Sequence, residues 1–409
     1  MTNRREFIQS AGKTAASALA LAGLEPATLW AMAHPGASVE ERTQDEAFWF
    51  PIQQAYTVDR TLINLNNGGV SPAPRVVQEA MKRYLDYSNT APTYAMWQVL
   101  EPQRETVRRR IAEMFGVDAE EIALTRNASE GLQICQQGFD LHGGDELLTT
   151  NQDYPRMVNT WKQVQRREGA VLRQFPIPTP CETPEAIVEA YAKHITPRTR
   201  LILVSHMIFM TGQIMPLREV AALGRERGIP VLVDGAHAFA NFVFKREDLE
   251  CDYYATSLHK WLCAPHGTGF LYVRQSKIQD LWPLTPPPEE LAPDIRKFEE
   301  IGTHPAANAL AVGDAITFHQ GIGGKVKEER LRYLKNRWAQ RLVELPNVKL
   351  HTSLKPQFSC GIGTMQIEGI DSQALADWLW KKHKIIVSPI KHTEFEGIRI
   401  SPNVYTSLE

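Results

Sequence analysis

The sequence predicts an α/β protein with a large domain on a mostly parallel central sheet and a smaller α+β domain at the C-terminal end. The first observation is the apolar run 231–233, followed by Asp234 and Gly235, the pattern of a buried parallel strand that ends at a turn. The second is a similar strand at 253–256, which leads into Ser257. The third is size, because 409 residues, 43% of them hydrophobic, can bury a large core and favour two domains.

The N-terminal segment has the features of a twin-arginine export signal. Residues 3–9 read Asn-Arg-Arg-Glu-Phe-Ile-Gln, residues 15–24 are mildly apolar, and the small-x-small sequence at 31–33 resembles a cleavage site. The apolar stretch is too short for a membrane span, and an amphipathic helix of a cytosolic protein is the alternative. We therefore expect residues 1–33 to be a signal peptide read by the twin-arginine (Tat) export machinery, a periplasmic location, and a mature chain that starts near His34.

Charge and cysteine content exclude several classes of function. With 45 basic and 47 acidic residues the net charge is −2, so no electrostatic surface for nucleic acid is expected. The run Arg108-Arg109-Arg110 lies in a helical pattern and is expected to form a solvated face. The five cysteines have neither C-x-x-C nor zinc spacing, so no metal site and no disulfide is assigned to Cys135, Cys181, Cys251, Cys263 and Cys360.

Apolar periodicity predicts the order of the elements and a division into parts. We expect an arm at 34–75, a large cofactor-binding domain at 76–295 and a small C-terminal domain at 296–409. In the large domain, helices are expected at 74–86 and 101–115, and residues 125–131 are expected to open a third that runs through Leu132 and Cys135; strands are expected at 122–124, 146–149, 200–204 and 269–273. In the small domain, helices are expected at 324–345 and 372–382, with strands at 362–367 and 385–388.

Asp234 and Lys260 are the residues on which the functional interpretation depends. In open α/β sheets ligands bind at the carboxyl ends of the strands, where Asp234 stands and where the second strand delivers Ser257, His259 and Lys260. Taken alone, Asp234 is most simply a turn residue and Lys260 a solvated charge. Together, a buried acid and a lysine at a sheet edge suit a Schiff base to an aromatic aldehyde whose ring nitrogen needs a carboxylate. That is the chemistry of pyridoxal phosphate (PLP).

The conjunction of three motifs resembles a known family. Residues 231–237, 257–261 and the glycine-rich 265–270 are similar to motifs of class V aminotransferase-like PLP enzymes, in the branch of isopenicillin N epimerase and the cysteine desulfurases. The resemblance extends over residues 64–405. It implies a PLP fold-type I architecture and a PLP cofactor held by the lysine and aspartate named above.

The resemblance also assigns residues to the cofactor phosphate. Ala128 and Ser129 match the family's phosphate residues, and a helix N-terminus with free N–H groups suits an anion, although Ser129 fits equally well as a helix N-cap. Ser257 and His259 are expected to hold the same phosphate from the other side. Thr303 matches a threonine that crosses a dimer interface to the partner's phosphate, so a homodimer is expected.

Other matching positions concern the cofactor ring. Tyr154 matches the ring that stacks on the pyridine face, with Ala236 on the opposite face. Relatives in the desulfurase branch often carry an asparagine where this chain has Phe209, and that side chain would bind the cofactor phenolate. The departure weakens a desulfurase assignment and makes His237 the expected neighbour of the phenolate.

Two positions match substrate residues of the family. Asn67, in an Asn-Gly-rich turn, matches an asparagine at the substrate end of the site, with an ordinary turn as the alternative. Arg399 matches the arginine that grips a substrate carboxylate with two parallel hydrogen bonds, with a half-exposed strand arginine as the alternative.

Cysteine desulfurases place a nucleophilic cysteine just before this arginine strand. The corresponding loop here, 389–396, has none, and Cys360 lies in an earlier strand-like run that is expected to be core. We therefore do not expect a persulfide-forming desulfurase. The chain ends at Glu409, before the terminal helix that relatives usually carry, which suggests a truncated sequence.

These parts predict a periplasmic PLP enzyme that acts at the α-carbon of an amino acid or of a peptide-linked, glutamate-type amine. Lys260 is the expected general base and acid, and Asp234 keeps the ring nitrogen protonated. Transamination or related tailoring is the first expectation, and amino-acid epimerisation or C–S lysis is the alternative. Periplasmic relatives include an enzyme that remodels the glutamate side chain of the siderophore pyoverdine, so siderophore tailoring is a candidate.

Other classes of protein fit less well. The sequence Ser257-Leu258-His259-Lys260 also fits the Ser-x-x-Lys motif of penicillin-binding proteins, but the partner motifs Ser-Asp-Asn and Lys-Thr-Gly are missing from the mature chain. A binding protein that kept the fold without the chemistry would not need both Asp234 and Lys260. A dinucleotide enzyme is disfavoured because no complete G-x-G-x-x-G follows a strand.

Overall fold

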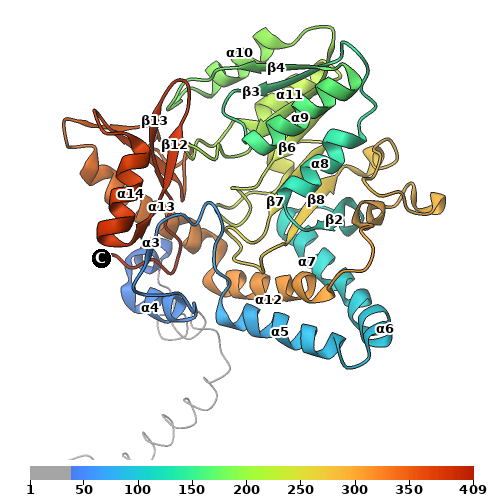
Figure 1. Cartoon of the computed structure of the whole chain (residues 1–409), viewed down its shortest axis with the longest axis horizontal. Helices are drawn as coiled ribbons and strands as arrows, with labels where there is room; N and C mark the ends of the chain where they lie inside the picture. Colours follow the sequence, from blue (N-terminus) through green and yellow to red (C-terminus); the bar gives the residue numbers. More distant parts are fainter. Residues whose placement is uncertain (1–37) are drawn as a thin grey trace, which may run out of the picture.

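The structure, a computed structural model, describes residues 38–409. The predicted signal peptide, residues 1–33, lies outside the described residues. Figure 1 shows a large sheet with helices on both faces and a smaller sheet near the C-terminus, drawn in red. None of the helices within residues 38–409 is both long and apolar enough to cross a membrane.

The large sheet has seven strands in the order β2-β8-β7-β6-β5-β3-β4. All run in one direction except β8, which is antiparallel to both of its neighbours. The carboxyl ends of β5, β6 and β7 therefore lie side by side at one edge. The strands are β2 (Ile122–Thr125), β3 (Glu146–Thr150), β4 (Val171–Phe175), β5 (Thr199–Ser205), β6 (Val231–Asp234), β7 (Tyr253–Ser257) and β8 (Gly269–Val273).

Alternation along the strands decides which helices cover which face. In β5, Leu201 and Leu203 belong to the core under α8 and α9, whereas Ile202 and Val204 belong to the core under α7, α10, α11 and α12. Both faces are buried, as the near-continuous apolar strands predict. The helices are α7 (Arg104–Phe115), α8 (Ala128–Gly138), α9 (Pro155–Glu168), α10 (Pro184–His194), α11 (Leu217–Glu226) and α12 (Ala306–Ile322).

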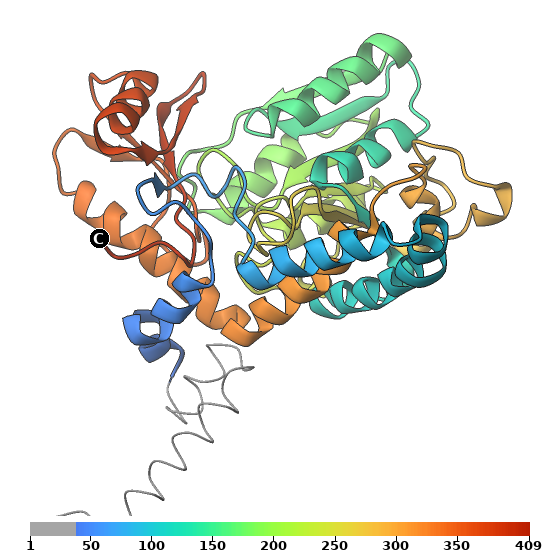
Figure 2. The ribbon, with the colours of Figure 1, turned by 60° about the horizontal axis from the view of Figure 1, so that its bottom comes forward.

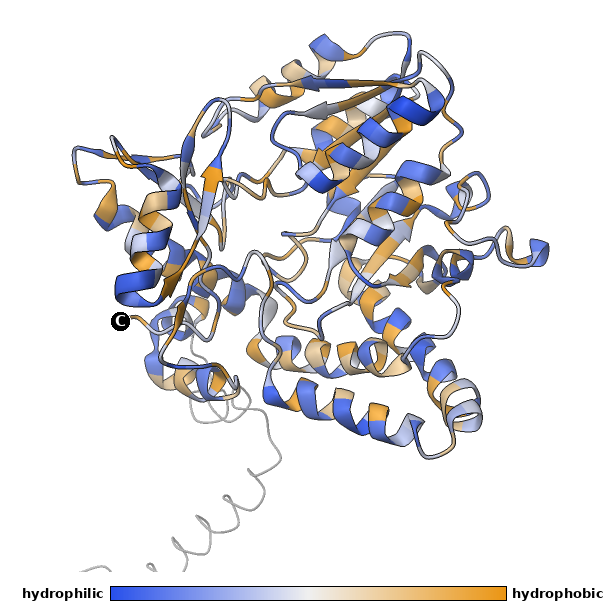
Figure 3. Cartoon of the chain, in the orientation of Figure 1, coloured by the Kyte–Doolittle hydropathy of each residue, from blue (hydrophilic) through white to orange (hydrophobic). Residues whose placement is uncertain are grey.

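Helix α12 is largely buried, and α5 (Arg75–Ser88) packs on its outer side. Figure 3 shows α12 mostly in hydrophobic colours, while α5 carries a hydrophilic outer side. Because α12 packs against α5 and α7, it lies with the large sheet although it follows the predicted boundary at residue 296, and that boundary stays a prediction.

The prediction that residues 108–110 form a solvated face is wrong for Arg108 and Arg110, although Arg109 is exposed. Arg108 is only 1% exposed, and its guanidinium bonds to Glu105, to Glu299 and to the Ile122 carbonyl. Arg110 is half-buried and donates to the Gly313 carbonyl of α12 over 2.7 Å. Helical periodicity does not show that acids almost 200 positions away in the sequence neutralise this helix face.

The C-terminal region contains a four-stranded antiparallel sheet, in the order β12-β13-β10-β9, with α14 packed on it. The predicted class, a mostly parallel large sheet with a smaller α+β region, is confirmed. The elements are α13 (Gly324–Leu342), β9 (Val348–Leu350), β10 (Gly363–Ile367), α14 (Ser372–His383), β12 (Ser388–Lys391) and β13 (Glu396–Ile400).

The N-terminal arm contacts both α13 and the C-terminal region. Its helices α3 (Val39–Gln44) and α4 (Glu46–Gln54) lie beside α13 in both ribbon views, and its strand β1 (Ile63–Asn64) pairs in parallel with β11 (Ile385–Ile386) (Figure 2). The remaining elements are short turns: α6 (Pro92–Tyr94), η1 (Ala95–Leu100), η2 (Glu101–Gln103), η3 (Ala119–Glu121), η4 (Arg246–Asp248), η5 (Gln275–Lys277), η6 (Glu289–Leu291) and η7 (Ile295–Glu299).

Candidate active site

The carboxyl ends of β5, β6 and β7 open onto a cavity of about 170 Å³. Most of the residues predicted to bind the cofactor line it, although they come from four separate segments of the chain. They are Ala128, Ser129, Tyr154, Asp234, His237, Ser257, His259 and Lys260, together with Ala236.

Asp234 is the last residue of β6 and is buried beside its neighbours on β5 and β7. One carboxylate oxygen accepts the N–H of Ala236 over 3.0 Å. Burial raises the pKa of Asp234 to about 6, against the opposing effects of that N–H and of Lys260, and the Asp153 carboxylate adds to the rise. A cationic partner would remove this penalty, so the site is suited to a protonated ring nitrogen.

Lys260 brings its amine to the same cavity from the loop after β7. Its Nζ lies 3.1 Å from Nε2 of His237. Burial lowers the pKa of Lys260 to about 8, with Asp234 acting in the opposite direction and Arg399 adding to the lowering. The neutral fraction of this amine near physiological pH is therefore far larger than for an ordinary lysine, and the neutral form is the nucleophile.

His237 is buried and has an unsatisfied atom. Its Nδ1 has no hydrogen-bond partner among the described residues, which is unusual for a buried polar atom. Burial first, then Lys260 and Arg399, hold its pKa well below the ordinary value, so the ring is neutral. A neutral imidazole with one unpaired nitrogen can form a hydrogen bond with an oxygen of a bound group.

The helix start at α8 settles the question about Ser129. Asn127 is the N-cap, because its Oδ1 accepts the Glu130 N–H over 2.9 Å, which leaves the Ser129 side chain at the cavity. Across from it, Ser257 Oγ accepts the Ala128 N–H over 3.0 Å. His259 donates a hydrogen bond from Nδ1 to the Thr268 carbonyl. A helix N-terminus, two hydroxyls and an imidazole nitrogen converge where an anion would be stabilised.

Tyr154 stands at the cavity with its ring edge-on to Phe209, at a centroid distance of 5.4 Å. The residue before it, Asp153, is buried and accepts hydrogen bonds from Thr149, Thr150 and Ser205. Asp153 therefore fixes the turn that presents Tyr154. This positioning role was not predicted, because Ser205 is 52 residues away in the sequence.

Arg399 is a buried cation without a counter-ion. It is 6% exposed, donates to the Phe209 carbonyl over 3.1 Å and to Asn66 Oδ1 over 2.7 Å, and its Nε has no partner. No carboxylate of the described residues lies within ion-pair distance of it. Burial lowers its pKa to about 10, with Tyr154 acting in the opposite direction. A buried charge of this kind is costly unless a ligand neutralises it.

The structure does not bring Asn67 to the cavity. Its side chain is fully buried, with the amide donating to the carbonyls of Asn64 and Ser401 and the oxygen accepting from Tyr405. Asn67 holds the turn against the C-terminal strand, and the neighbouring Asn66 contacts Arg399 instead. Sequence spacing cannot separate two adjacent asparagines that point in different directions.

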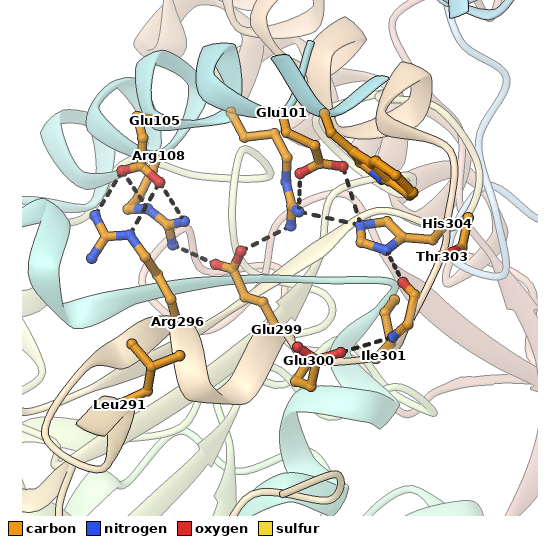
Figure 4. A pocket seen from close by; sticks show the side chains of 13 residues that line it. Glu101, Glu105, Arg108, Leu291, Arg296, Glu299, Glu300, Ile301, Thr303 and His304 are labelled. Carbon is orange, nitrogen blue, oxygen red and sulfur yellow. Dashed lines mark hydrogen bonds and ion pairs between the residues drawn. The ribbon is translucent and has the colours of Figure 1, made fainter. Parts of the chain in front are cut away.

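Thr303 is also outside the cavity. It is exposed and lines a separate hollow of about 570 Å³, shown in Figure 4, with Glu299 and His304. The segment before Thr303 is held by Glu299, which pairs with Arg104 and Arg108. The predicted contact of Thr303 with a partner's phosphate stays a prediction.

No cysteine of the described residues lines the cavity. All five are free and buried, and the predicted core position of Cys360 is confirmed, since its Sγ contacts the Asn241 carbonyl and burial raises its pKa to about 12. The serine–lysine alternative also does not fit, because Ser257 Oγ accepts a backbone N–H while Lys260 Nζ faces His237. The described residues hold no cluster of side chains suited to a metal ion.

Comparisons with known proteins agree with this geometry. The aminotransferase class-V family matches residues 63–399. Isopenicillin N epimerase of Streptomyces clavuligerus is 29% identical over 89% of this chain and 96% of its own, and a probable cysteine desulfurase of Vibrio cholerae serotype O1 is 25% identical over 88% and 93%. The cystine C–S lyase C-DES with its product cysteine persulfide superposes with a TM-score of 0.74 and 25% identity over 86% of this chain and 94% of that one. A C-DES mutant with glycine covalently linked to the PLP cofactor gives a TM-score of 0.76 and 24% identity over 87% and 95%.

The chain belongs to the aminotransferase class-V family. It is a PLP-dependent enzyme of fold-type I.

The residues present fit this cofactor. Lys260 supplies a partly neutral amine for the aldehyde, and Asp234 an acid for the ring nitrogen. The Nδ1 atom of the buried His237 has no hydrogen-bond partner among the described residues, and the oxygen on the cofactor ring would supply one. The cluster at the start of α8, with Ser257 and His259 opposite it, suits the phosphate.

Proposed function

We propose that the protein transforms the amine-bearing α-carbon of an amino acid, or of a peptide-linked, glutamate-type amine, with transamination as the leading reaction. The observation that carries the proposal is Arg399, a buried guanidinium without a carboxylate partner, close enough to Lys260 and His237 to shift the pKa of both. A substrate whose carboxylate pairs with Arg399 would have its amine and α-carbon near the Lys260 amine.

PLP supplies an electron sink for a bond that breaks at the α-carbon. Asp234 holds a proton on the ring nitrogen, because its carboxylate is stabilised when a cation lies next to it. Lys260 binds the aldehyde and, once released by the substrate amine, takes and returns the α-proton. His237, neutral and 3.1 Å from Nζ, orients the lysine amine and hydrogen-bonds it.

Epimerisation and C–S lysis are the second candidates. The 29% identity to an isopenicillin N epimerase supports the first, and the 25% identity to a cystine C–S lyase supports the second. A persulfide mechanism on an enzyme cysteine is disfavoured, because no cysteine of residues 38–409 lines the cavity. Product analysis separates the reactions: a keto acid with the amine form of the cofactor, an inverted amino acid, or released sulfur.

The test of the proposed function measures both the attachment of the cofactor and the affinity for the substrate. Borohydride reduction of the purified mature protein should place a pyridoxyl label on Lys260 and on no other residue. In Arg399→Met the label should remain, while affinity for carboxylate amines falls about 100-fold, because charge-assisted hydrogen bonds contribute about 1.5–3 kcal/mol each. An unlabelled Lys260, or an Arg399→Met variant with unchanged affinity, would contradict the proposal.

We further propose export by the Tat pathway to the periplasm and the tailoring of a secreted peptide such as a siderophore. The support is the twin-arginine sequence at 3–9, which lies outside the described residues. Arg4→Lys/Arg5→Lys should keep the protein in the cytoplasm, as fractionation would show. Equal amounts of both forms in the periplasm would refute the export proposal.

We also propose a homodimer. The support is the exposed position of Thr303, away from its own cavity, at a hollow that a partner could enter. Light scattering of the purified protein should give twice the mass of the chain, and a monomer at micromolar concentration would argue against it.

A further inference from the structure

Arg156 is a second cation at the cavity that the cofactor chemistry does not use. It lies in the first turn of α9, two residues after Tyr154, and its side chain lines the cavity with Ser129 and Tyr154. The side chain is exposed, and no Asp or Glu of residues 38–409 pairs with it. Within the described chain, Arg156 is therefore a cation aimed at the cavity and left without an acid.

The charges around the cavity are unbalanced toward the positive. Among the lining residues of the described chain, Asp234 is the only carboxylate, and the proposed function uses it for the ring nitrogen. Lys260 and Arg156 line the cavity, and Arg399 interacts with both Lys260 and Tyr154. Two guanidinium groups therefore serve this region: that of Arg399, buried on β13, and that of Arg156, exposed on α9.

The position of Arg156 favours an exchanging ligand over the cofactor. The groups suited to the phosphate, Ala128 and Ser257, line the cavity and are buried. Arg156 is exposed, as expected of a group that meets a molecule arriving from solvent. An arginine recognises a carboxylate with two parallel hydrogen bonds, which gives both affinity and orientation.

We propose that Arg156 binds a second carboxylate of the substrate, so that the preferred substrate is an amine with two carboxylates: an acidic amino acid or a peptide end of that kind. Arg399 takes the carboxylate on the α-carbon and Arg156 the distal one. The inference rests on the proposed function and deepens it by naming the class of substrate and a residue that selects it.

The test compares an acid with its neutral isostere. The holoenzyme is titrated with glutamate and with glutamine, each as the L and D enantiomer, by visible absorbance and by calorimetry. Arg156→Gln should lower the affinity for glutamate about 10-fold and the affinity for glutamine less than 2-fold. Arg156→Lys should restore part of the lost glutamate affinity. Arg166→Gln, which makes the same charge change at an exposed arginine in the last turn of α9, is the matched control and should change neither.

Three results would overturn the assignment. The first is a wild-type enzyme that does not bind glutamate more tightly than glutamine, and the second is an Arg156→Gln variant that binds both equally more weakly. The third is a fall in the affinity of the Arg156→Gln apoenzyme for PLP with an unchanged ratio of glutamate to glutamine affinity, which would make Arg156 a ligand of the cofactor phosphate. Failure of the proposed function itself is seen separately, as a wild-type protein in which Lys260 takes no pyridoxyl label.

Discussion

At the scale of single residues, burial does most of the chemical tuning. Asp234, His237 and Lys260 all have shifted pKa values whose largest cause is the loss of water around them. Arg399 shows the same effect without a compensating acid. These groups are poised for charges that arrive with ligands, which is typical of functional sites.

The pKa of Lys260 predicts how the apoenzyme captures PLP. Only the neutral amine attacks the aldehyde, and its fraction rises with pH through the lowered pKa of about 8, instead of through the ordinary lysine value. The rate of cofactor capture, followed by visible absorbance in stopped flow, should therefore rise with a midpoint near pH 8.

Asp234→Asn is the control for this prediction. The Asp234 carboxylate raises the Lys260 pKa, so removing its charge should move the midpoint below that of the wild type. A wild-type midpoint above pH 10, or a shift to higher pH in the variant, would contradict the buried environment described for Lys260.

At the scale of elements, ion pairs between distant segments place α7, β2 and the segment before Thr303. Glu299, at the end of η7, pairs with Arg108 of α7 (Figure 4). It also pairs with Arg104 and accepts the Leu124 N–H of β2 over 2.7 Å. Because both ends of these pairs are largely buried, the arginines would be left in low dielectric if the acid were removed.

Glu299→Gln should therefore destabilise the protein by about 3 kcal/mol in urea unfolding, since it leaves buried arginines short of a partner. Glu300→Gln is the matched control: Glu300 is exposed, and within residues 38–409 its carboxylate accepts only the Gly302 N–H. The control should change stability by less than about 0.5 kcal/mol. Equal losses in the two variants would show that the Glu299 network is not structural.

Element-level patterns in the small domain were more accessible to prediction. Ile398 and Ile400 pack into the core of the C-terminal sheet, as the spacing around Arg399 predicts, and they leave the arginine on the other face of β13. The alternation of a strand is local, so it can be recognised without knowledge of partners. The partners of Arg399 could not be predicted in this way, because Asn66 lies 333 positions away in the sequence.

At the scale of the whole molecule, the arm fastens the C-terminal region to the body of the protein. Arg330 of α13 is fully buried between the rings of Trp49 and Tyr333, pairs with Glu46 over 2.6 Å and donates to the Thr43 carbonyl. This contact joins the start of the described chain to the helix that leads into the small domain.

Arg330→Leu should destabilise the protein by about 3 kcal/mol and expose the arm to protease before the rest unfolds, because the ion pair of a buried guanidinium and its two cation–π contacts are lost together. Arg341→Leu, an exposed residue of the same helix, is the control. Limited proteolysis with N-terminal sequencing would locate the first cut. Identical cleavage of both variants would show that Arg330 does not anchor the arm.

The sequence by itself determined the strand ends that lead to Asp234 and Lys260, the presence of a helix through Leu132 and Cys135, and the family to which these motifs belong. Those features depend on local periodicity and on short spacings. The tertiary structure alone decided that Asn66 and not Asn67 meets Arg399, that Arg108 is buried, and that Arg399 and Arg156 have no ion pair with an acid of the described residues. The physical reason is that burial and ion pairing depend on segments far apart in the chain, and only the packed sheet edge brings them together.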